Sequence, residues 1–243
     1  MPAKGEIAIV LLDVSEIRNV ERIKKDFVVN VSHELRTPLT AIKGFVETML
    51  GDVQKQDHKR YLDIIKRHTD RLINIVKDLM MLSSLERQSS LEIEDVSLGE
   101  LIEQTRKVYD QPLKEKGLSL RIEFDDEHIV LKADPFKLEQ VFINLIDNAI
   151  KYTEQGGISI KVSHEQKYVA IVIEDTGIGM SANHLAKIFE RFYVVDKSRS
   201  RKVGGTGLGL SIVKHILLLH NATITVQSNV GIGTTFTIHL PLV

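Results

Sequence analysis

Apolar residues between about Ile17 and Leu50 recur every three or four positions, which is the spacing of an amphipathic helix. The members of this stripe are Val20, Ile23, Phe27, Val31, Leu35, Ile42, Phe45 and Met49. The polar stretch GDVQKQD at 51–57 interrupts the pattern, and a second stripe follows, made of Ile65, His68, Leu72, Ile75, Leu79 and Leu82. The two stripes predict a hairpin of two long helices.

A lone hairpin with stripes of this length leaves apolar surface exposed to water. Pairing with a second copy into a four-helix bundle covers that surface. We therefore expect a homodimer formed through the helical hairpin.

The stretch GEIAIVLLDVSE at residues 5–16 has the pattern of one strand that leads into a helix. A single strand cannot bury itself, so we expect this one to end a domain that precedes the hairpin. On this interpretation the sequence is a fragment.

After the polar, serine-rich stretch SSLERQSS at 83–90 the pattern changes from long helices to alternating helices and strands. Helical patterns near 98–116, 135–153, 181–190 and 208–220 alternate with the strand-like runs LSLRIEF, HIVLKA, GISIKVS, YVAIVIED, ATITVQS and TTFTIHLPL. Adjacent strands at the end suggest hairpins. The pattern predicts an α+β domain with a mixed sheet whose helices cover one face.

Composition excludes several classes of protein. The 32 basic residues nearly balance the 33 acidic ones, which gives no reason to expect nucleic acid as a partner. Cysteine is absent, so disulfides and thiolate chemistry are excluded. The sequence has no apolar run near the roughly 20 residues of a membrane span and no signal-peptide pattern, so we expect a soluble fragment without membrane contact.

Candidate chemistry begins within the first stripe, in SHELRTPLT at 32–40. His33 lies about 200° around the helix from Val31 and should point outward. Glu34 can take a proton from the imidazole, and Thr37 lies one turn on, where its hydroxyl can orient water or a phosphoryl oxygen. Pro38 can kink the helix at the Glu34 carbonyl. The alternatives are a plain surface histidine and a surface threonine whose hydroxyl bonds to a carbonyl one turn back.

A second group of polar residues lies in NLIDNAIKY at 144–152, where Asn144, Asn148 and Lys151 share one helix face. Amide oxygens are suitable ligands for Mg²⁺, and lysine neutralises phosphate. In DTGIGM at 175–180, Asp175 ends a strand and can accept a hydrogen bond from an amino group such as that of adenine. Solvated asparagines and an ordinary turn are the alternatives.

A glycine-rich loop, GGTGLGLSIV at 204–213, leads into a helix, which is an arrangement that directs backbone N–H groups at phosphate. The loop lacks the Lys-Ser/Thr pair of a Walker A motif, and no strand leads directly into it. The preceding stretch carries Lys197, Arg199, Arg201 and Lys202. These cations either close over phosphates as a lid or form a solvated loop.

The order of these segments resembles that of the sensor histidine kinases of two-component signalling, from about Asp13 to Val243. The segments resemble the H box (SHELRTPLT), N box (NLIDNAIKY), G1 box (DTGIGM), F box (IFERFY) and G2 box (GGTGLGL). The H box and the strand before Asp13 are most similar to the phosphate-regulon sensor type. The family often has His-Gly-Gly after the last helix, whereas this sequence has His220, Asn221 and Ala222.

The resemblance implies three domains. These are the end of an upstream PAS-like sensor domain at 1–14, a dimerisation and histidine-phosphotransfer domain at 15–88, and a catalytic domain at 89–243. The catalytic domain is expected to be an ATP-binding α/β sandwich of the kind shared with gyrase B and heat-shock 90 chaperones.

The resemblance also implies a role for each matching residue. His33 is implied as phosphoacceptor, Glu34 as base, and Thr37 as a residue that assists dephosphorylation of the partner regulator. In the ATP site, the implied Mg²⁺ ligand is Asn148, with Asn144 beside it. The other implied nucleotide contacts are Lys151, Tyr152, Asp175, Gly177, Gly179, Gly205, Gly207, Leu208 and Gly209.

The resemblance thus implies a kinase that uses ATP and Mg²⁺ and transfers phosphate to the receiver domain of a response regulator, with phosphatase activity on that regulator. It also implies the cytoplasmic portion of a protein anchored in the bacterial inner membrane. Two alternatives are a nucleotide-binding dimerisation module without catalysis and a gyrase-type ATPase. Gyrase-type ATPases use an acidic residue to activate water, and Asn144 stands in that place here.

Overall fold

The computed structural model describes residues 15–50, 55–87, 90–126, 128–196 and 204–242. The chain forms two compact units, one up to His68 and one from Thr69 onward, so the boundary falls inside a helix. The strand expected at 5–16 falls mostly in residues 1–14, outside the described residues, and Ser15 already begins a helix. Each unit is described by itself below.

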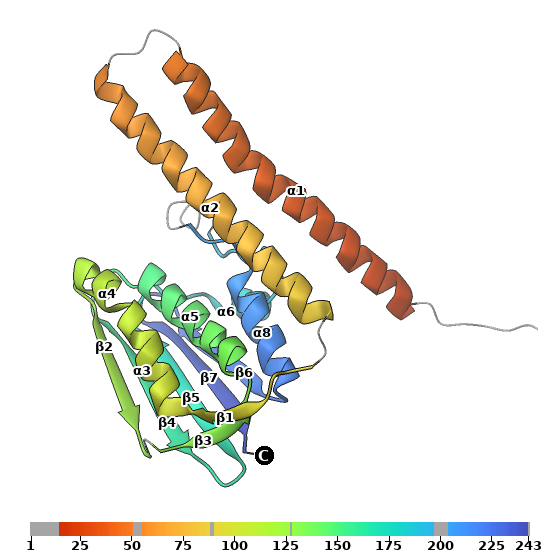
Figure 1. The fold of residues 1–243 in the computed structure, drawn as a ribbon, viewed down its shortest axis with the longest axis vertical. Coiled ribbons are helices and arrows are strands. Elements are labelled where there is room, and N and C mark those ends of the chain that lie inside the picture. Colours follow the sequence, from red (N-terminus) through yellow and green to blue (C-terminus); the bar gives the residue numbers. More distant parts are fainter. Residues whose placement is uncertain (1–14, 51–54, 88–89, 127, 197–203, 243) are drawn as a thin grey trace, which may run out of the picture. The chain divides into compact units, whose positions relative to one another are not determined.

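Helix α1, Ser15–Leu50, and the first part of helix α2, Lys55–Arg87, form the first unit. These are the two long helices predicted from the stripes (Figure 1). The rings of Phe45 and Tyr61 pack with their centroids 5.5 Å apart and so join the two helices. Helix α1 continues through Pro38 to Leu50, so the proline does not end the helix as it often does.

The second unit contains a five-stranded sheet with the order β2-β4-β5-β7-β6. The strands are β2 (Ser119–Phe124), β4 (Gly157–His164), β5 (Tyr168–Asp175), β6 (Thr223–Asn229) and β7 (Gly233–Pro241). The pair β2 and β4 is parallel and the other pairs are antiparallel, which confirms the predicted mixed sheet.

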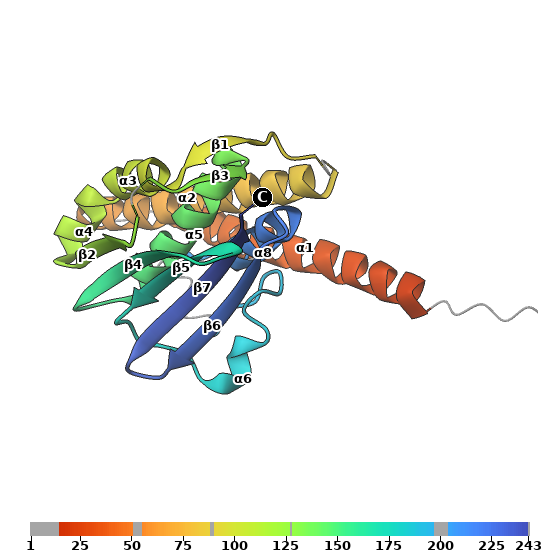
Figure 2. The same ribbon diagram turned by 90° about the horizontal axis from the view of Figure 1, so that it is seen from below.

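Alternating residues of the central strands bury one face of this sheet. Ile160, Ile173 and Phe236 pair across β4, β5 and β7, and all three are buried. Period-two alternation places such residues on a single face. Helices α3 (Leu98–Val108), α5 (Pro135–Tyr152) and α8 (Gly209–Leu219) lie along one side of the sheet, as Figure 2 shows.

Several elements differ from the predicted ones. The helix expected over 98–116 is interrupted at Tyr109 and continues as α4, Asp110–Lys116. The helix expected at 181–190 is limited to α6, Ala182–Leu185, followed by turns. The sequence pattern also missed strand β1, Glu94–Ser97, which pairs antiparallel with β3, Val130–Ala133.

The start of α5 and the end of α8 meet at Asp134, the residue that caps α5. Its carboxylate accepts hydrogen bonds from the backbone N–H groups of Lys137 and Glu92, and its own N–H donates to Nε2 of His220 over 3.0 Å. Asn221 follows with φ 54°, a left-handed conformation that asparagine tolerates better than most residues. The departure from His-Gly-Gly therefore still provides a left-handed residue at this turn.

Candidate phosphoacceptor and nucleotide sites

The histidine segment lies on α1, and His33 is exposed as predicted from its angle to the stripe. Glu34 is half-buried. The hydroxyl of Thr37 donates to the backbone carbonyl of His33 over 3.1 Å. This bond uses the hydroxyl proton, so the oxygen of Thr37 can still accept a hydrogen bond from water.

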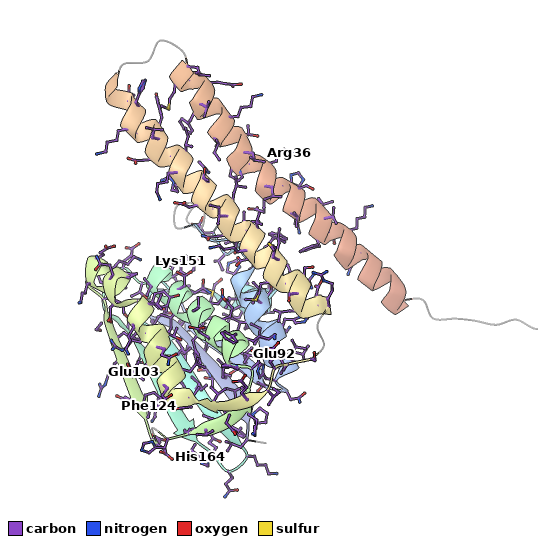
Figure 3. The ribbon with its side chains drawn as sticks, in the orientation of Figure 1. Arg36, Glu92, Glu103, Phe124, Lys151 and His164 are labelled. Atoms are coloured by element: carbon purple, nitrogen blue, oxygen red, sulfur yellow. The ribbon has the colours of Figure 1, made fainter. Side chains whose placement is uncertain are left out.

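Helix α5 carries the asparagine segment. The Asn144 amide N–H donates to the Gln140 carbonyl over 2.9 Å, so its Oδ1 points away from that bond. Lys151, near the end of the helix (Figure 3), pairs with Asp147 over 2.6 Å. Among the residues that the structure describes, no hydrogen bond engages the Asn148 side chain. An unengaged amide oxygen is a suitable donor for a hard cation.

The glycine-rich loop meets α5 at the first residue of α8. A Cβ atom on Gly209 would lie 2.7 Å from Oδ1 of Asn144, which is closer than Cβ atoms approach other atoms in real structures. Gly209 therefore lets the helix N-terminus approach the asparagine face directly. The two segments that the sequence suggested for metal and phosphate lie side by side.

The DTGIGM segment meets the other end of α5. The Ile178 N–H donates to the Tyr152 carbonyl over 3.2 Å, and the Gly177 N–H donates to Oδ1 of Asp175 over 2.8 Å. Asp175 is 8% exposed, and burial raises the pKa of its carboxyl above the ordinary value. A carboxylate that still has a lone pair available can accept a hydrogen bond from the amino group of a ligand. Gly179 lies in the loop that follows.

The IFERFY segment also contacts the glycine-rich loop. Gly207 has φ 74°, and a Cβ there would come within 2.8 Å of the Phe192 backbone. The Phe192 N–H donates to the Gly207 carbonyl over 2.8 Å. Gly205 precedes this contact, and Leu208 is fully buried at the start of α8. The four cations at 197–202, for which the sequence left a lid or a solvated loop open, lie outside the described residues.

The donors around this site fit a magnesium nucleotide. They comprise the N-terminal N–H groups of α8 for phosphate, the Lys151 ammonium and the amide oxygens of Asn144 and Asn148. Within the described ranges, no group of three or more His, Cys, Asp or Glu residues could hold a metal alone. Since Mg²⁺ commonly shares its coordination between the protein and substrate phosphates, a few protein oxygens suffice.

The sequence analysis missed three polar residues at this site. Asp147 pairs with Lys151, and the Thr206 hydroxyl donates to Oδ2 of Asp78 on α2 over 2.6 Å. Thr206 lies inside the glycine-rich segment, so its position was a signal that could have been used. Asp78 is one of many polar residues on α2, and no local pattern distinguishes it.

Comparison with known proteins explains this arrangement. Residues 23–88 match the family model described as "His Kinase A (phospho-acceptor) domain". Residues 133–243 match "Histidine kinase-, DNA gyrase B-, and HSP90-like ATPase". The fold is therefore a phosphoacceptor helical hairpin followed by an ATPase sandwich.

Similar curated proteins include the phosphate regulon sensor protein PhoR of Pseudomonas aeruginosa, which is 40% identical over 232 residues, covering 93% of this chain and 52% of PhoR. The sensor protein kinase WalK of Staphylococcus haemolyticus is 40% identical over 243 residues, covering 98% of this chain and 40% of WalK. The chain thus spans about half the length of these relatives, or less.

Solved structures show the same fold. The histidine kinase ThkA in complex with response regulator protein TrrA has a TM-score of 0.78 at 27% identity, covering 95% of this chain and 65% of that one. The Acinetobacter baumannii histidine kinase AdeS has a TM-score of 0.71 at 27% identity, covering 86% of this chain and 98% of that one. The chain belongs to the sensor histidine kinases of two-component signalling. In the described part, no helix is long and apolar enough to span a membrane.

Proposed function

We propose that this chain phosphorylates its own His33 from Mg·ATP and passes the phosphoryl group to an aspartate of a response regulator. The observation that carries this proposal is the contact of Gly209 with Asn144 and of Gly207 with Phe192, since these contacts bring the asparagine, aromatic and glycine segments to one helix N-terminus. The relative ThkA was solved with a response regulator, which supports the choice of partner.

In the proposed reaction, an imidazole nitrogen of His33 attacks the γ-phosphorus of ATP in line, and the bond to the bridging oxygen breaks to release ADP. Glu34 accepts the imidazole proton or fixes the ring tautomer. Asn148 and the nucleotide phosphates hold Mg²⁺, with Asn144 beside them. Because His33 and the nucleotide site belong to different units, closure between the units gates transfer.

The proposed nucleotide site also includes residues at the end of α5 and in the two glycine-containing loops. Lys151 and Tyr152 contact the nucleotide at the end of α5, and Asp175 accepts a hydrogen bond from the adenine amino group. The N–H of Leu208 and the glycines of the two loops contact the phosphates through the backbone. These glycines are Gly177, Gly179, Gly205, Gly207 and Gly209.

We further propose a homodimer through the hairpin. On α1, Val28, Leu39 and Val46 are between 41% and 58% exposed, and helix geometry places them within about 20° of one line. On α2, Leu62, Ile73, Val76 and Met80 are also exposed and share one face. A second copy forming a four-helix bundle would bury both faces.

The proposed domain limits are the end of an upstream sensor domain at 1–14, the phosphoacceptor domain at 15–88 and the catalytic domain at 89–243. We also propose that the chain is the cytoplasmic portion of a longer sensor anchored in the bacterial inner membrane. Thr37 is proposed to hold the water that removes phosphate from the regulator.

Incubation with γ-labelled ATP and Mg²⁺ tests the kinase proposal. We expect acid-labile, base-stable label that maps to His33. His33→Gln should abolish it, while His58→Gln, a histidine on α2, should retain it. Acid-stable label on serine or threonine would contradict the proposal.

A further inference from the structure

Helix α2 contacts the glycine-rich loop through one polar side chain. The Thr206 hydroxyl donates to Oδ2 of Asp78 over 2.6 Å, and the Thr206 oxygen accepts from the Leu208 N–H over 3.2 Å. An ionised carboxylate only accepts hydrogen bonds, so the hydroxyl proton is directed to Asp78 and a lone pair remains for Leu208. Thr206 is thus held from both sides.

Leu208 occupies a position that a nucleotide would use. It is the N-cap residue of α8, and its own side chain makes no capping hydrogen bond. The N–H groups at a helix N-terminus are the groups that bind phosphate. In this structure the Thr206 oxygen accepts a hydrogen bond from the N–H of Leu208, so this N–H already has a side-chain partner.

The charge of Asp78 opposes an anionic ligand at the same place. Burial raises the pKa of this carboxyl, while the hydrogen bond from Thr206 and the charge of Lys151 lower it. Asp78 and Lys151 are therefore close enough to interact electrostatically. A polyphosphate that pairs with Lys151 would meet repulsion from Asp78.

A second contact connects α2 with the segment that packs on the loop. Glu86 forms an ion pair with Arg191, the residue before Phe192. Phe192 in turn donates its N–H to the carbonyl of Gly207. The ion pair is partly exposed and contributes little free energy by itself. It does show that α2 reaches both segments that form this side of the site.

We propose that Asp78 is a positioning residue that keeps Thr206 on the Leu208 N–H, so that Mg-nucleotide must displace this contact to bind at the α8 N-terminus. This inference depends on the proposed nucleotide site. The carboxylate of α2 then acts as a competitor of nucleotide phosphate, and nucleotide binding loosens the hold of α2 on the glycine loop.

The first test measures the affinity for Mg-ADP by calorimetry at fixed ionic strength. Asp78→Ala should tighten binding by roughly 3- to 10-fold, since one charge-assisted hydrogen bond no longer has to be broken. Asp63→Ala, an exposed acid on the same helix, should bind as the parent does. A purely structural role for Asp78 predicts weaker binding instead, and unchanged or weaker binding overturns the proposal.

Thr206→Val completes a double-mutant cycle. Under the proposal it tightens binding in the parent but adds nothing to Asp78→Ala, because both changes release the same contact. Additive effects overturn the coupling. Asp78→Asn keeps an acceptor but removes the charge, so its affinity should fall between those of the parent and Asp78→Ala.

The second test needs no nucleotide. Amide hydrogen exchange of peptides covering 204–210 should accelerate in Asp78→Ala and stay unchanged in Asp63→Ala. If the parent binds no Mg-ADP, the proposed nucleotide site fails, while the exchange result still decides whether Asp78 holds the loop. Unchanged exchange in Asp78→Ala overturns the inference in either case.

Discussion

The helical hairpin and the ATPase sandwich differ in what their side chains bury. Among the described side chains between Arg22 and His68, only Pro38 is buried, and apolar residues such as Val28 and Leu39 are more than half exposed. In the sandwich, Ile160, Ile171 and Ile212 are fully buried. The sandwich has its own core, whereas the hairpin up to His68 has an apolar face without one.

The functional polar residues of the two regions also differ in how many neighbours hold their side chains. In the sandwich, Asn144, Asp175 and Lys151 are held by neighbours on their own or adjacent elements. His33 instead lies exposed on the surface of a single helix. A site that binds nucleotide benefits from fixed side chains. In our proposal, His33 must be reached first by ATP as the phosphoryl donor and then by the regulator aspartate as the acceptor, and exposure serves that purpose.

The largest effect should come from the sandwich. Asn148→Ala should lower autophosphorylation by roughly 100-fold or more, because it removes the proposed magnesium ligand. Dimerisation should not change, since Asn148 lies outside the hairpin. Label incorporation and sedimentation measure the two properties, and Asn183→Ala, an exposed asparagine, is the control. Equal activity in Asn148→Ala would show that the ligand assignment is wrong.

The next effect concerns the exposed face of the hairpin. Val46→Glu should raise the dissociation constant of the dimer by roughly 10- to 100-fold, because burial of one valine contributes about 1.5–3 kcal/mol. Thr48→Glu places the same charge about 200° from this face and should have little effect. Sedimentation over a dilution series measures both. A dimer that resists Val46→Glu would place the interface elsewhere.

A smaller effect is expected at Thr37. Thr37→Ala should keep autophosphorylation and slow dephosphorylation of phospho-regulator by roughly 10-fold, because water loses a positioning group. Thr48 is a matched control, since its hydroxyl likewise donates to a carbonyl one turn back, that of Gly44, over 2.8 Å. If Thr37→Ala and Thr48→Ala both dephosphorylate the phospho-regulator at the parent rate, the Thr37 hydroxyl only makes its hydrogen bond within the helix and does not position water.

The smallest effect should appear in the pH dependence of sandwich stability. Burial lowers the pKa of the His220 imidazole, and the facing charges are Asp134, which raises it, and Lys137, which lowers it. The unfolded chain then binds a proton more readily than the folded one. Stability from this site is complete above pH 6.5, the ordinary pKa, and is lost as pH falls through the lower folded pKa.

His220→Gln should remove this dependence, because a glutamine oxygen can accept from the Asp134 N–H without titrating. Melting temperatures between pH 7.5 and 5 measure this pH dependence. Each kcal/mol lost from the free energy of unfolding lowers the melting temperature by roughly 2–4 °C. His128→Gln, an exposed histidine, should melt as the parent does at each pH. If the melting temperatures of the parent and of His220→Gln fall equally as the pH is lowered, His220 is excluded as the cause.

Local patterns predicted the long helices and most of the strands, since periodicity reports which face of an element is buried. They failed at Tyr109, where a single residue with φ −101° and ψ 1° divides a helix whose apolar spacing continues. Strand β1 was missed because Glu94 and Asp95 disfavour strands, and its pairing with β3 comes from a distant segment.

Local sequence patterns also predicted only part of the candidate site. Its glycine and asparagine segments could be recognised because each is contiguous in sequence. The contact of Thr206 with Asp78 joins residues 128 positions apart, and no pattern within either helix or loop encodes it. Such pairs depend on tertiary packing.

The parallel pairing of β2 with β4 has a consequence for how the sandwich assembles. Parallel neighbours require a crossover connection, and here the chain between them contains β3 and α5, the helix with Asn144 and Asn148. Pairing of the edge strand β2 with β4 therefore closes a loop that contains α5. Closing such a long loop is slow compared with forming a hairpin. The helix that binds nucleotide in our proposal is thus also the connection on which completion of the sheet depends.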